Sequence, residues 1–301
     1  MEQSTKLSVL DLGEHLLGFY DGRISGVRYY SDAPNWLDDG GFALGICSYA
    51  VVDGASAIVY DTHLSIAHAR DIRNILEARG VRDIRVVLSH WHLDHVAGNA
   101  VFEDCEIIAC AQTARLLSEH KTAIEAGTHD GPPGIAPLVM PTTIFYGGLE
   151  LTCGDVGIDL RPLDIHSSDG VAMFLPSDGT LLVGDTLEDT VTYVVEPDRL
   201  ALHLSDLERM SNWDFSRILP NHGAKERIIG EGYDRGLIEA TQTYVERLLK
   251  VREDERLAFV ALPDFIPEAL ASGAVSFFDP YEAVHRGNVE KVLALRHTAT
   301  A

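Results

Sequence analysis

Residues 84–95 read IRVVLSHWHLDH, and this stretch decides how the rest of the chain is interpreted. Its first five residues form an apolar run interrupted only by Arg85, which is typical of a buried strand. Four ligand-type side chains follow at once, and these are His90, His92, Asp94 and His95. Imidazole and carboxylate groups together suit zinc, iron, manganese or nickel, and at one strand end they can converge on ions a few ångströms apart. A lone histidine would more simply be a surface or structural residue, but this density predicts a metal site.

Three further ligand candidates each stand at the end of an apolar run, where a scaffold presents its loop chemistry. They are His166 after residues 158–165, Asp185 after residues 181–184, and His222 after residues 218–221. Such residues are needed because a catalytic zinc ion usually takes three protein ligands and leaves a position for water. Other histidines lack this setting, so we expect them to be surface or structural residues: His15, His63, His68, His120, His129, His203 and His297.

Strand-like and helix-like patterns alternate along the chain. Residues 64–79 have apolar side chains near helical spacing, followed by Gly80 as a stop, so a helix is predicted between strands at 57–60 and 84–88. Further helices are expected at 111–125, 204–212 and 233–252. Strands are also expected at 16–20, 42–52, 106–109, 142–146, 149–153, 159–163, 171–175, 180–183 and 217–219, and those from 142 to 183 are assigned largely to a second sheet. This order favours an α/β fold in which two sheets pack face to face with helices outside, a four-layer αββα sandwich.

The length and composition favour one large domain with an appendage. The 301 residues have 46% hydrophobic content, which is enough to bury a substantial core. We expect one catalytic domain at residues 1–252 and a helical C-terminal extension, residues 253–301, packed on it. Within the extension, Pro263, Pro267 and Pro280 are expected to separate helices.

Charge and cysteine content limit the expected partners and location. The formal charge of −22 repels polyanions, so nucleic acid and anionic membrane surfaces are not expected partners. The four cysteines show no CxxC spacing, which fits buried thiols in a reducing compartment. Residues 1–10 lack a secretory signal, and no run approaches the ~18 apolar residues of a membrane span. A cytoplasmic protein that acts on a small-molecule substrate is therefore expected.

Four ordered stretches resemble motifs of the metallo-β-lactamase superfamily: its HxHxDH signature, its second motif, its bridging-acid motif and its last motif. In that order they are HWHLDH at 90–95, HSSDG at 166–170, GDTL at 184–187 and PNHG at 220–223. Four motifs in the right order are a specific signal, and the resemblance spans roughly residues 42–250. Ile165 and Asn221 stand where glycine is common in the family, and neither difference removes a ligand.

The resemblance implies a pair of metal ions and a role for each ligand. His90, His92 and His166 would hold the first ion, Asp94, His95 and His222 the second, and Asp185 would bridge the two. Asp61, which ends the strand at 57–60, resembles the early aspartate that braces the metal loop. By the resemblance, two divalent ions facing two carboxylates would leave a positive centre, so that a bridging hydroxide would form near neutral pH and would attack a carbonyl or phosphorus. Asp94 would shuttle a proton to the leaving group. Zinc is expected because hydrolysis needs no redox chemistry, although iron or manganese also fits such ligands.

The resemblance therefore implies a metal-dependent hydrolase acting on an ester, lactone or related acyl bond. Acyl-homoserine lactonases of this family resemble the chain in ligand set and size and place a tyrosine near the substrate oxygen. Tyr193 is the candidate here, and an ordinary packed aromatic is the simpler reading. Three other activities of the family fit the chain less well. β-Lactamases of the fold usually lack the bridging aspartate, and glyoxalase II has a basic helical tail that is not apparent here. RNA-processing members need basic surfaces, whereas this chain is acidic. A phosphodiesterase, a β-lactamase-like hydrolase, an iron-dependent oxygen-using enzyme and a non-enzymatic regulatory or binding protein remain as alternatives.

Two segments outside the motifs are further candidates for the pocket or for a homodimer contact. Residues 29–36 combine aromatic and turn residues, as a flap would, and Trp36 could equally be a packing anchor or an interface residue. Residues 281–289 resemble a C-terminal motif of some family members. His285 in that motif could face the pocket, and a helix-surface histidine is the simpler reading.

Overall fold

The computed structural model describes residues 7–22, 30–31, 33, 35–37 and 45–298. Part of the flap expected at 29–36 and the first residues of the strand expected at 42–52 lie outside the described residues. The chain divides into two compact units, Met1–Pro162 with Met173–Ser177 and Leu163–Ala172 with Asp178–Ala301. Residues 253–301 belong to the second unit, and a domain boundary after Arg252 stays a prediction.

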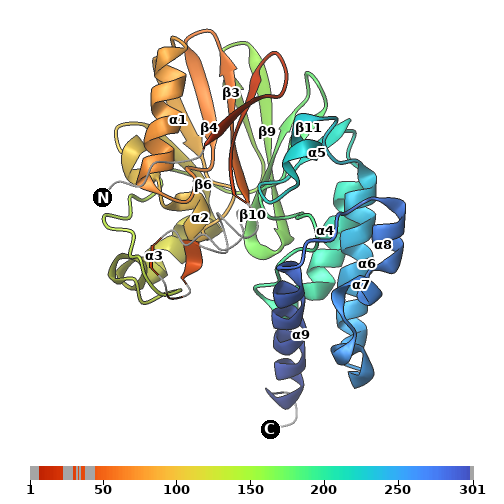
Figure 1. The fold of residues 1–301 in the computed structure, drawn as a ribbon. Helices are drawn as coiled ribbons and strands as arrows, with labels where there is room; N and C mark the ends of the chain where they lie inside the picture. The colour runs from red at the N-terminus through yellow and green to blue at the C-terminus, as the bar shows by residue number, and fades with distance from the viewer. Residues whose placement is uncertain (1–6, 23–29, 32, 34, 38–44, 299–301) are drawn as a thin grey trace. The chain divides into compact units, whose positions relative to one another are not determined.

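The first unit contains a mixed seven-stranded sheet whose strand order follows the sequence (Figure 1). Its strands are β1 (Ser8–Asp11), β2 (Leu16–Asp21), β3 (Ile46–Asp53), β4 (Ser56–Tyr60), β5 (Asp83–Val87), β6 (Glu106–Cys110) and β7 (Thr143–Phe145). Strands β1 to β4 pair antiparallel, and β4 to β7 pair parallel. In the β4–β5 register Tyr60 lies opposite Val87, so both strands end together. The residues that follow them therefore leave the sheet at the same edge.

Helix α1 (Ile66–Ala78) connects β4 to β5 and packs on the sheet through one apolar face. Ser65 caps the helix, because its side chain accepts a hydrogen bond from the backbone N–H of His68. The helix is followed by Gly80 at φ +95°, the left-handed region that favours glycine. Helix α3 (Ala111–Ala126) follows β6 as the sequence predicts. The helices and the sheet share one hydrophobic core that includes Val59, Ala69, Ile72, Leu76, Val86, Phe102 and Leu117.

A second sheet has five strands in the order β12-β11-β10-β9-β8. They are β8 (Leu149–Cys153), β9 (Val156–Ile165), β10 (Ser167–Leu175), β11 (Thr180–Leu182) and β12 (Arg217–Leu219). Within the first unit, β8 lies against β3 and β4 of the first sheet. The Cys153 thiol donates to the carbonyl of Val51, and the backbone N–H of Asp155 donates to the Asp53 carboxylate. The two sheets therefore pack together with helices around them, and the predicted α/β sandwich is confirmed.

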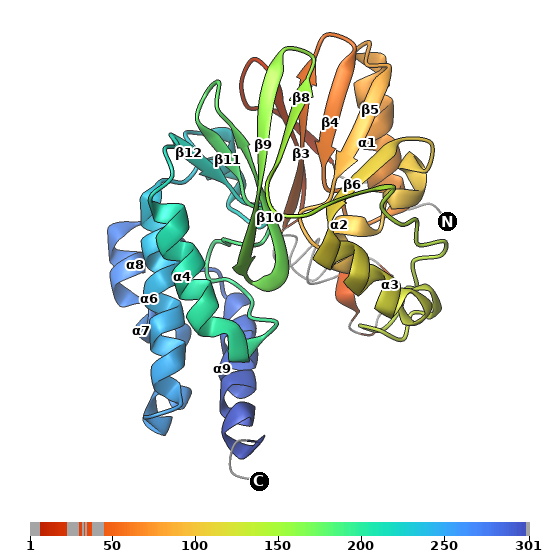
Figure 2. The ribbon, with the colours of Figure 1, turned by 180° about the vertical axis from the view of Figure 1, so that it is seen from behind.

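The second unit carries a group of helices on which the tail is packed (Figure 2). These are α4 (Leu200–Ser211), α5 (Lys225–Ile229), α6 (Arg235–Val251), α7 (Leu262–Phe265), α8 (Pro267–Ser272) and α9 (Tyr281–Thr298). Helices α4 and α9 both contact α6. The buried residues of α6 include Leu237, Tyr244 and Leu248. Pro263 and Pro267 lie in the first turns of α7 and α8, as their role as breaks predicts. None of the helices described here has the length and apolar character needed to span a membrane.

Three local predictions differ from the structure. The strand expected at 142–146 in the second sheet is β7, which pairs with β6 at the edge of the first sheet. Strand β1 was not predicted, because its four residues hold only two apolar side chains. The cluster expected as a loop contains the short helix α2 (Leu93–Val96), which precedes a 3₁₀ turn at Asn99–Phe102. Polar ligand residues hide helical periodicity, so the pattern could not reveal this turn of helix.

Candidate metal centre

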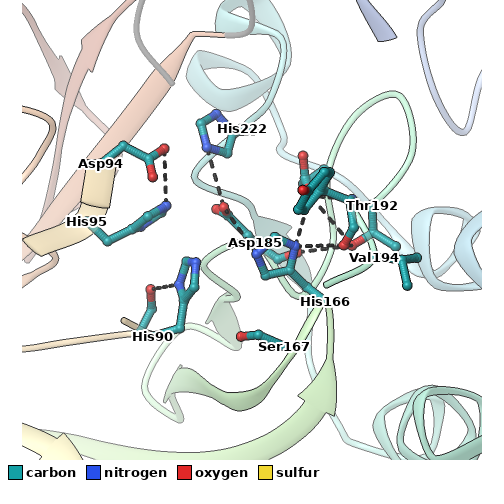
Figure 3. Close-up of polar contacts among 12 residues, drawn as sticks. His90, Asp94, His95, His166, Ser167, Asp185, Thr192, Val194 and His222 are labelled. Atoms are coloured by element: carbon teal, nitrogen blue, oxygen red, sulfur yellow. Dashed lines mark hydrogen bonds and ion pairs between the residues drawn. The ribbon is translucent and has the colours of Figure 1, made fainter. Parts of the chain in front are cut away.

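The first group of ligand candidates is gathered at the end of β5. The imidazole centroid of His90 lies 4.5 Å from that of His92 and 4.2 Å from that of His95. A carboxylate oxygen of Asp94 lies 3.5 Å from Nε2 of His95 (Figure 3). His90 and His95 are buried, whereas the side chain of Asp94 is 16% exposed. The four residues predicted from one short stretch therefore lie together in the first unit.

A buried carboxylate holds this group from behind. Asp61 follows β4 at φ +68° and is fully buried. Its Oδ1 accepts a hydrogen bond from the backbone N–H of Ser89 at 2.7 Å, and its Oδ2 accepts from the Ser89 hydroxyl at 2.6 Å. The same Oδ2 lies 2.9 Å from Nδ1 of His95. This is the bracing contact that the family resemblance implied for Asp61.

These contacts fix which imidazole nitrogen is available. A carboxylate only accepts, so Nδ1 of His95 carries the proton and Nε2 keeps its lone pair. The Ser89 hydroxyl donates to Asp61 and therefore accepts from Nδ1 of His90 at 2.9 Å. Nε2 of His90 is left as the unprotonated nitrogen. Metal-binding histidines usually use their second nitrogen in this way.

The second group lies in the second unit, at the ends of three strands. His166 occupies the turn between β9 and β10 at φ +69°, Asp185 follows β11, and His222 follows β12. An oxygen of the Asp185 carboxylate lies 3.8 Å from Nε2 of His166 and 3.4 Å from Nε2 of His222 (Figure 3). All three side chains are nearly inaccessible to solvent. The carboxylate predicted to bridge is thus the group that two of the predicted histidines face.

Glu188 is a buried acid beside His166 that the motif reasoning did not single out. Nδ1 of His166 donates to the carbonyl oxygen of Tyr193 at 2.8 Å, and Glu188 Oε1 lies 3.4 Å from the same nitrogen. Glu188 also accepts a hydrogen bond from the backbone N–H of Tyr193 at 2.8 Å. Its position directly after GDTL was visible in the sequence, but its burial and its contacts were not.

The donor set fits metal ions. All seven predicted ligands belong to groups of His and Asp side chains that are positioned to bind metal: His90, His92, Asp94, His95, His166, Asp185 and His222. Five imidazoles and two carboxylates suit zinc, iron or manganese. The hydrogen bonds at Nδ1 leave Nε2 as the ligand atom of His90, His95 and His166.

The other candidate pocket residues have different surroundings. The ring centroid of Tyr193 lies 6.0 Å from that of His166, and Tyr193 is 37% exposed. The Trp36 indole donates to the carbonyl of Pro133 and packs against the core of the first unit, as a packing anchor would. His285 is buried between Tyr244 and the carbonyl of Val260. Neither a pocket-facing nor a surface position is therefore correct for His285.

Several histidines expected to be structural are buried. His63 and His68 stack with their ring centroids 4.4 Å apart, and His68 contacts the Asp21 carboxylate at 2.7 Å. Burial, followed by the nearby His68, lowers the pKa of His63 well below its usual value. His120 stacks on Trp91, and the tilted ring of His129 lies with its centroid 5.0 Å from that of Trp91. The side chain of His297 lies outside the described residues.

Comparison with known proteins identifies the fold. A family model described as the metallo-beta-lactamase superfamily matches residues 43–256. A crystal structure of DIM-1 metallo-beta-lactamase exposed to ceftazidime is similar at 19% identity and TM-score 0.58, covering 81% of this chain and 99% of that one. A metallo-beta-lactamase from Pontibacter korlensis is similar at 15% identity and TM-score 0.59, covering 80% and 99%. At such identities these structures show a shared fold.

The curated relatives match this chain over only part of their own length. "Lactamase-like protein aptB" of Emericella nidulans is 26% identical over 71% of this chain and 62% of its own length. "Beta-lactamase-like protein 2 homolog" of Caenorhabditis elegans is 24% identical over 70% and 64%. "2,4-Dinitroanisole O-demethylase subunit alpha" of a Nocardioides strain is 24% identical over 58% and 51%. The chain spans less than two thirds of the length of each of these relatives.

Proposed function

Because the chain belongs to the metallo-β-lactamase superfamily, we propose that it is a dinuclear metal-dependent hydrolase of a small-molecule ester, lactone or related acyl bond. The observation that carries the proposal is the position of Asp185. Its carboxylate faces Nε2 of both His166 and His222, at 3.8 and 3.4 Å. By the family resemblance these histidines serve different ions, so a carboxylate between them is placed to bridge.

The proposed ligand assignment follows the two groups of residues. His90, His92 and His166 would hold one ion, Asp94, His95 and His222 the other, and Asp185 would bridge them. Two divalent ions, zinc in this proposal with iron or manganese as substitutes, would polarise a carbonyl and lower the pKa of coordinated water. The protein's contribution is to keep Nε2 of His90, His95 and His166 unprotonated and to bury these three imidazoles away from bulk water.

Two side chains are proposed to act on protons and on the substrate. Asp94 has a partly exposed carboxylate, unlike Asp61, so it can take a proton and give it to a leaving group. Tyr193 presents a partly exposed phenol beside His166 and is proposed to donate a hydrogen bond to a substrate oxygen. Asp185 completes the proposed catalytic set by holding the ions.

Charge and thiol content support the proposed substrate class and location. A net charge of −22 disfavours polyanionic substrates such as RNA, which leaves small molecules. All four cysteines are free thiols, in keeping with the proposed cytoplasmic location. A homodimer is the proposed assembly. One relative is named for an O-demethylase, so an aryl methyl ether belongs among the test substrates.

The test is the metal content and activity of Asp185→Asn against wild type. Protein purified without added metal should contain about two ions per chain and should hydrolyse at least one member of an ester, lactone, thioester, phosphodiester and 2,4-dinitroanisole panel. The variant should retain its fold and lose at least about 100-fold in activity, because a neutral amide is a poor bridging ligand. Asp198→Asn, which changes an exposed acid in the 3₁₀ turn at Pro197–Arg199, is the matched control and should behave as wild type.

Other results would redirect the proposal. One ion or none, with the activity of Asp185→Asn unchanged, would refute the dinuclear assignment. Cleavage of phosphodiesters alone would indicate the phosphodiesterase alternative, and abundant iron with oxygen consumption would indicate an oxygen-using enzyme. A metal-loaded protein that cleaves nothing in the panel and binds a partner protein tightly would favour the regulatory alternative.

A further inference from the structure

Helix α9 reaches the segment that orients His166. We propose that Asn288 of α9 is a positioning residue of the metal centre, which holds residues 192–194 so that His166 keeps the geometry of a ligand. This inference rests on the proposed function, because it takes His166 as a metal ligand. It assigns the C-terminal helix a role that neither the motifs nor the family match covers, since that match ends at residue 256.

The segment contacts His166 through both side chain and backbone. The carbonyl of Tyr193 accepts the Nδ1 proton of His166 at 2.8 Å, which fixes the tautomer and leaves Nε2 for metal. The backbone N–H of Val195 donates to the carbonyl of His166 at 3.0 Å. The orientation of the imidazole therefore depends on where the peptide groups around Tyr193 are held.

The side-chain amide of Asn288 forms hydrogen bonds with the segment on both sides of Tyr193. Nδ2 of Asn288 donates to the carbonyl of Thr192 at 2.9 Å, and Oδ1 accepts from the backbone N–H of Val194 at 2.8 Å. These two partners also settle the orientation of the amide, because a carbonyl can only accept and an N–H can only donate. Asn288 Nδ2 lies 3.0 Å from the hydroxyl oxygen of Tyr244, so the fully buried amide uses every one of its hydrogens.

Other residues of α9 also contact the segment or its neighbours. Lys291, three positions after Asn288 and so on the same face, donates from Nζ to the carbonyl of Val194 at 2.7 Å. Its ammonium group also lies 3.7 Å from the centroid of the Tyr193 ring. At the start of the helix, the Tyr281 hydroxyl lies 3.3 Å from Glu188, the acid that binds the N–H of Tyr193. Each peptide group from Thr192 to Val194 is thus tied to α9 or to a residue that α9 contacts.

The helix itself is anchored away from the segment. Nε2 of His285 donates to the carbonyl of Val260, so Nδ1 accepts the hydrogen bond of the Tyr244 hydroxyl at 3.2 Å. The oxygen of that hydroxyl in turn accepts from Asn288. A continuous series of hydrogen bonds therefore links the carbonyl of Val260 to the segment at 192–194, which orients His166. The series passes through the side chains of His285, Tyr244 and Asn288.

The test measures metal binding as well as fold. Asn288→Ala in the full chain removes both hydrogen bonds from Asn288 to the segment. Lys291→Met removes the hydrogen bond to the Val194 carbonyl and the ammonium group beside the Tyr193 ring, while keeping most of the side-chain length. The affinity for zinc is measured by competition with a chelating dye, and the ligand arrangement by visible absorption of the cobalt-substituted protein. The matched controls change exposed residues elsewhere: Asn212→Ala at the C-terminal cap of α4, and Lys250→Met in α6.

We expect Asn288→Ala to bind zinc about 10-fold or more weakly than wild type, and Lys291→Met to weaken binding by a smaller factor. The cobalt spectrum of Asn288→Ala should change, and both control variants should match wild type. Urea unfolding of the metal-free proteins distinguishes a positioning role from a merely structural one. A merely structural role would lower the midpoint of the unfolding transition and leave the zinc affinity unchanged. If Asn288→Ala does not fold, Lys291→Met decides by the same measurements.

The outcomes distinguish this inference from the proposed function. Wild type that binds zinc, with unchanged affinity and spectrum in both α9 variants, would overturn the role of Asn288 and leave the metal-dependent hydrolase standing. Wild type that binds no zinc, cobalt, iron or manganese would overturn both.

Discussion

Asp61 accepts three hydrogen bonds, two from Ser89 and one from His95 of the first ligand group. It is fully buried, and these donors help to compensate the charge of its carboxylate. Its left-handed φ of +68° is one that aspartate and asparagine adopt more readily than other residues with side chains. Asparagine can therefore replace it without backbone strain, which isolates the effect of its charge.

Asp61→Asn should weaken zinc binding by about 10–100-fold, because His95 loses a charged partner that orients it and raises its basicity. The metal-free protein should also lose roughly 1–3 kcal/mol of unfolding free energy, since an amide cannot accept all three hydrogen bonds. Zinc titration and urea unfolding measure the two effects. Asp83→Asn, an exposed acid at the start of β5, is the control, and equal zinc affinity in both variants would contradict the bracing role.

At the scale of elements, α1 and the 3₁₀ turn at 99–102 meet at Gly98. A Cβ built on Gly98 would lie 2.2 Å from the carbonyl oxygen of Thr62 and 2.4 Å from Cβ of Ala69. Neither atom belongs to the far end of a flexible side chain, so the elements themselves would have to move apart. The ligand-bearing helix α2 immediately precedes this contact.

Gly98→Ala should therefore lower the free energy of unfolding by about 1–3 kcal/mol or more, as overpacked sites do. It should also weaken zinc binding, because α2 moves with the turn that follows it. Gly157→Ala on β9, where a Cβ would meet no atom within 4 Å, is the matched control. Comparable stability of the two variants in urea would show that the contact at Gly98 is looser than described.

Element prediction succeeded where the signal was local. The strand, helix and strand predicted within residues 57–88 are confirmed. Their signals, the spacing of apolar side chains and the glycine at Gly80, lie within the elements themselves or directly beside them. The placement of β7 failed because strand pairing joins residues far apart, here Ala109 and Ile144, and leaves no trace in the strand itself. Helix α2 was not predicted because polar ligand-type side chains, Asp94 and His95, occupy two of its four positions.

At the scale of the molecule, buried neutral histidines make stability depend on pH. Burial lowers the pKa of His203 to about 4, and burial also lowers the pKa of His63 and of His285. The ring nitrogens of His203 form no hydrogen bond to the described residues, although Nε2 lies 3.7 Å from the Asp164 carboxylate. In the unfolded chain such a histidine titrates near pH 6.5, so below this pH the unfolded state binds a proton that the native state does not.

The free energy of unfolding of the metal-free protein should consequently fall as the pH drops from about 6.5 toward 4, and this loss is absent above pH 6.5. His203→Leu keeps the buried volume and removes one titrating group. Between about pH 7.5 and 5, wild type should lose roughly 2 kcal/mol more than this variant. Urea unfolding at both pH values checks the difference, and parallel losses in the two proteins would show that His203 titrates normally.

The sequence identified the seven residues that are positioned to bind metal much better than the residues that support them. The seven recur as ligand-type residues at strand ends, and the order of the motifs made them recognisable. Asn288 and Glu188 carry no such mark, because an asparagine on a helix and a glutamate in a loop are ordinary residues. Their roles arise from contacts across long separations, 94 residues between Val194 and Asn288.

That separation has a consequence for how the protein is made. A ribosome adds about 5–20 residues per second, so residues 192–194 are joined to the chain roughly 5–20 s before Asn288 is. During this interval His166 and the segment beside it exist without the helix that later holds them. If His166 binds an ion as proposed, an ion captured in this interval would meet an imidazole whose orientation α9 does not yet hold.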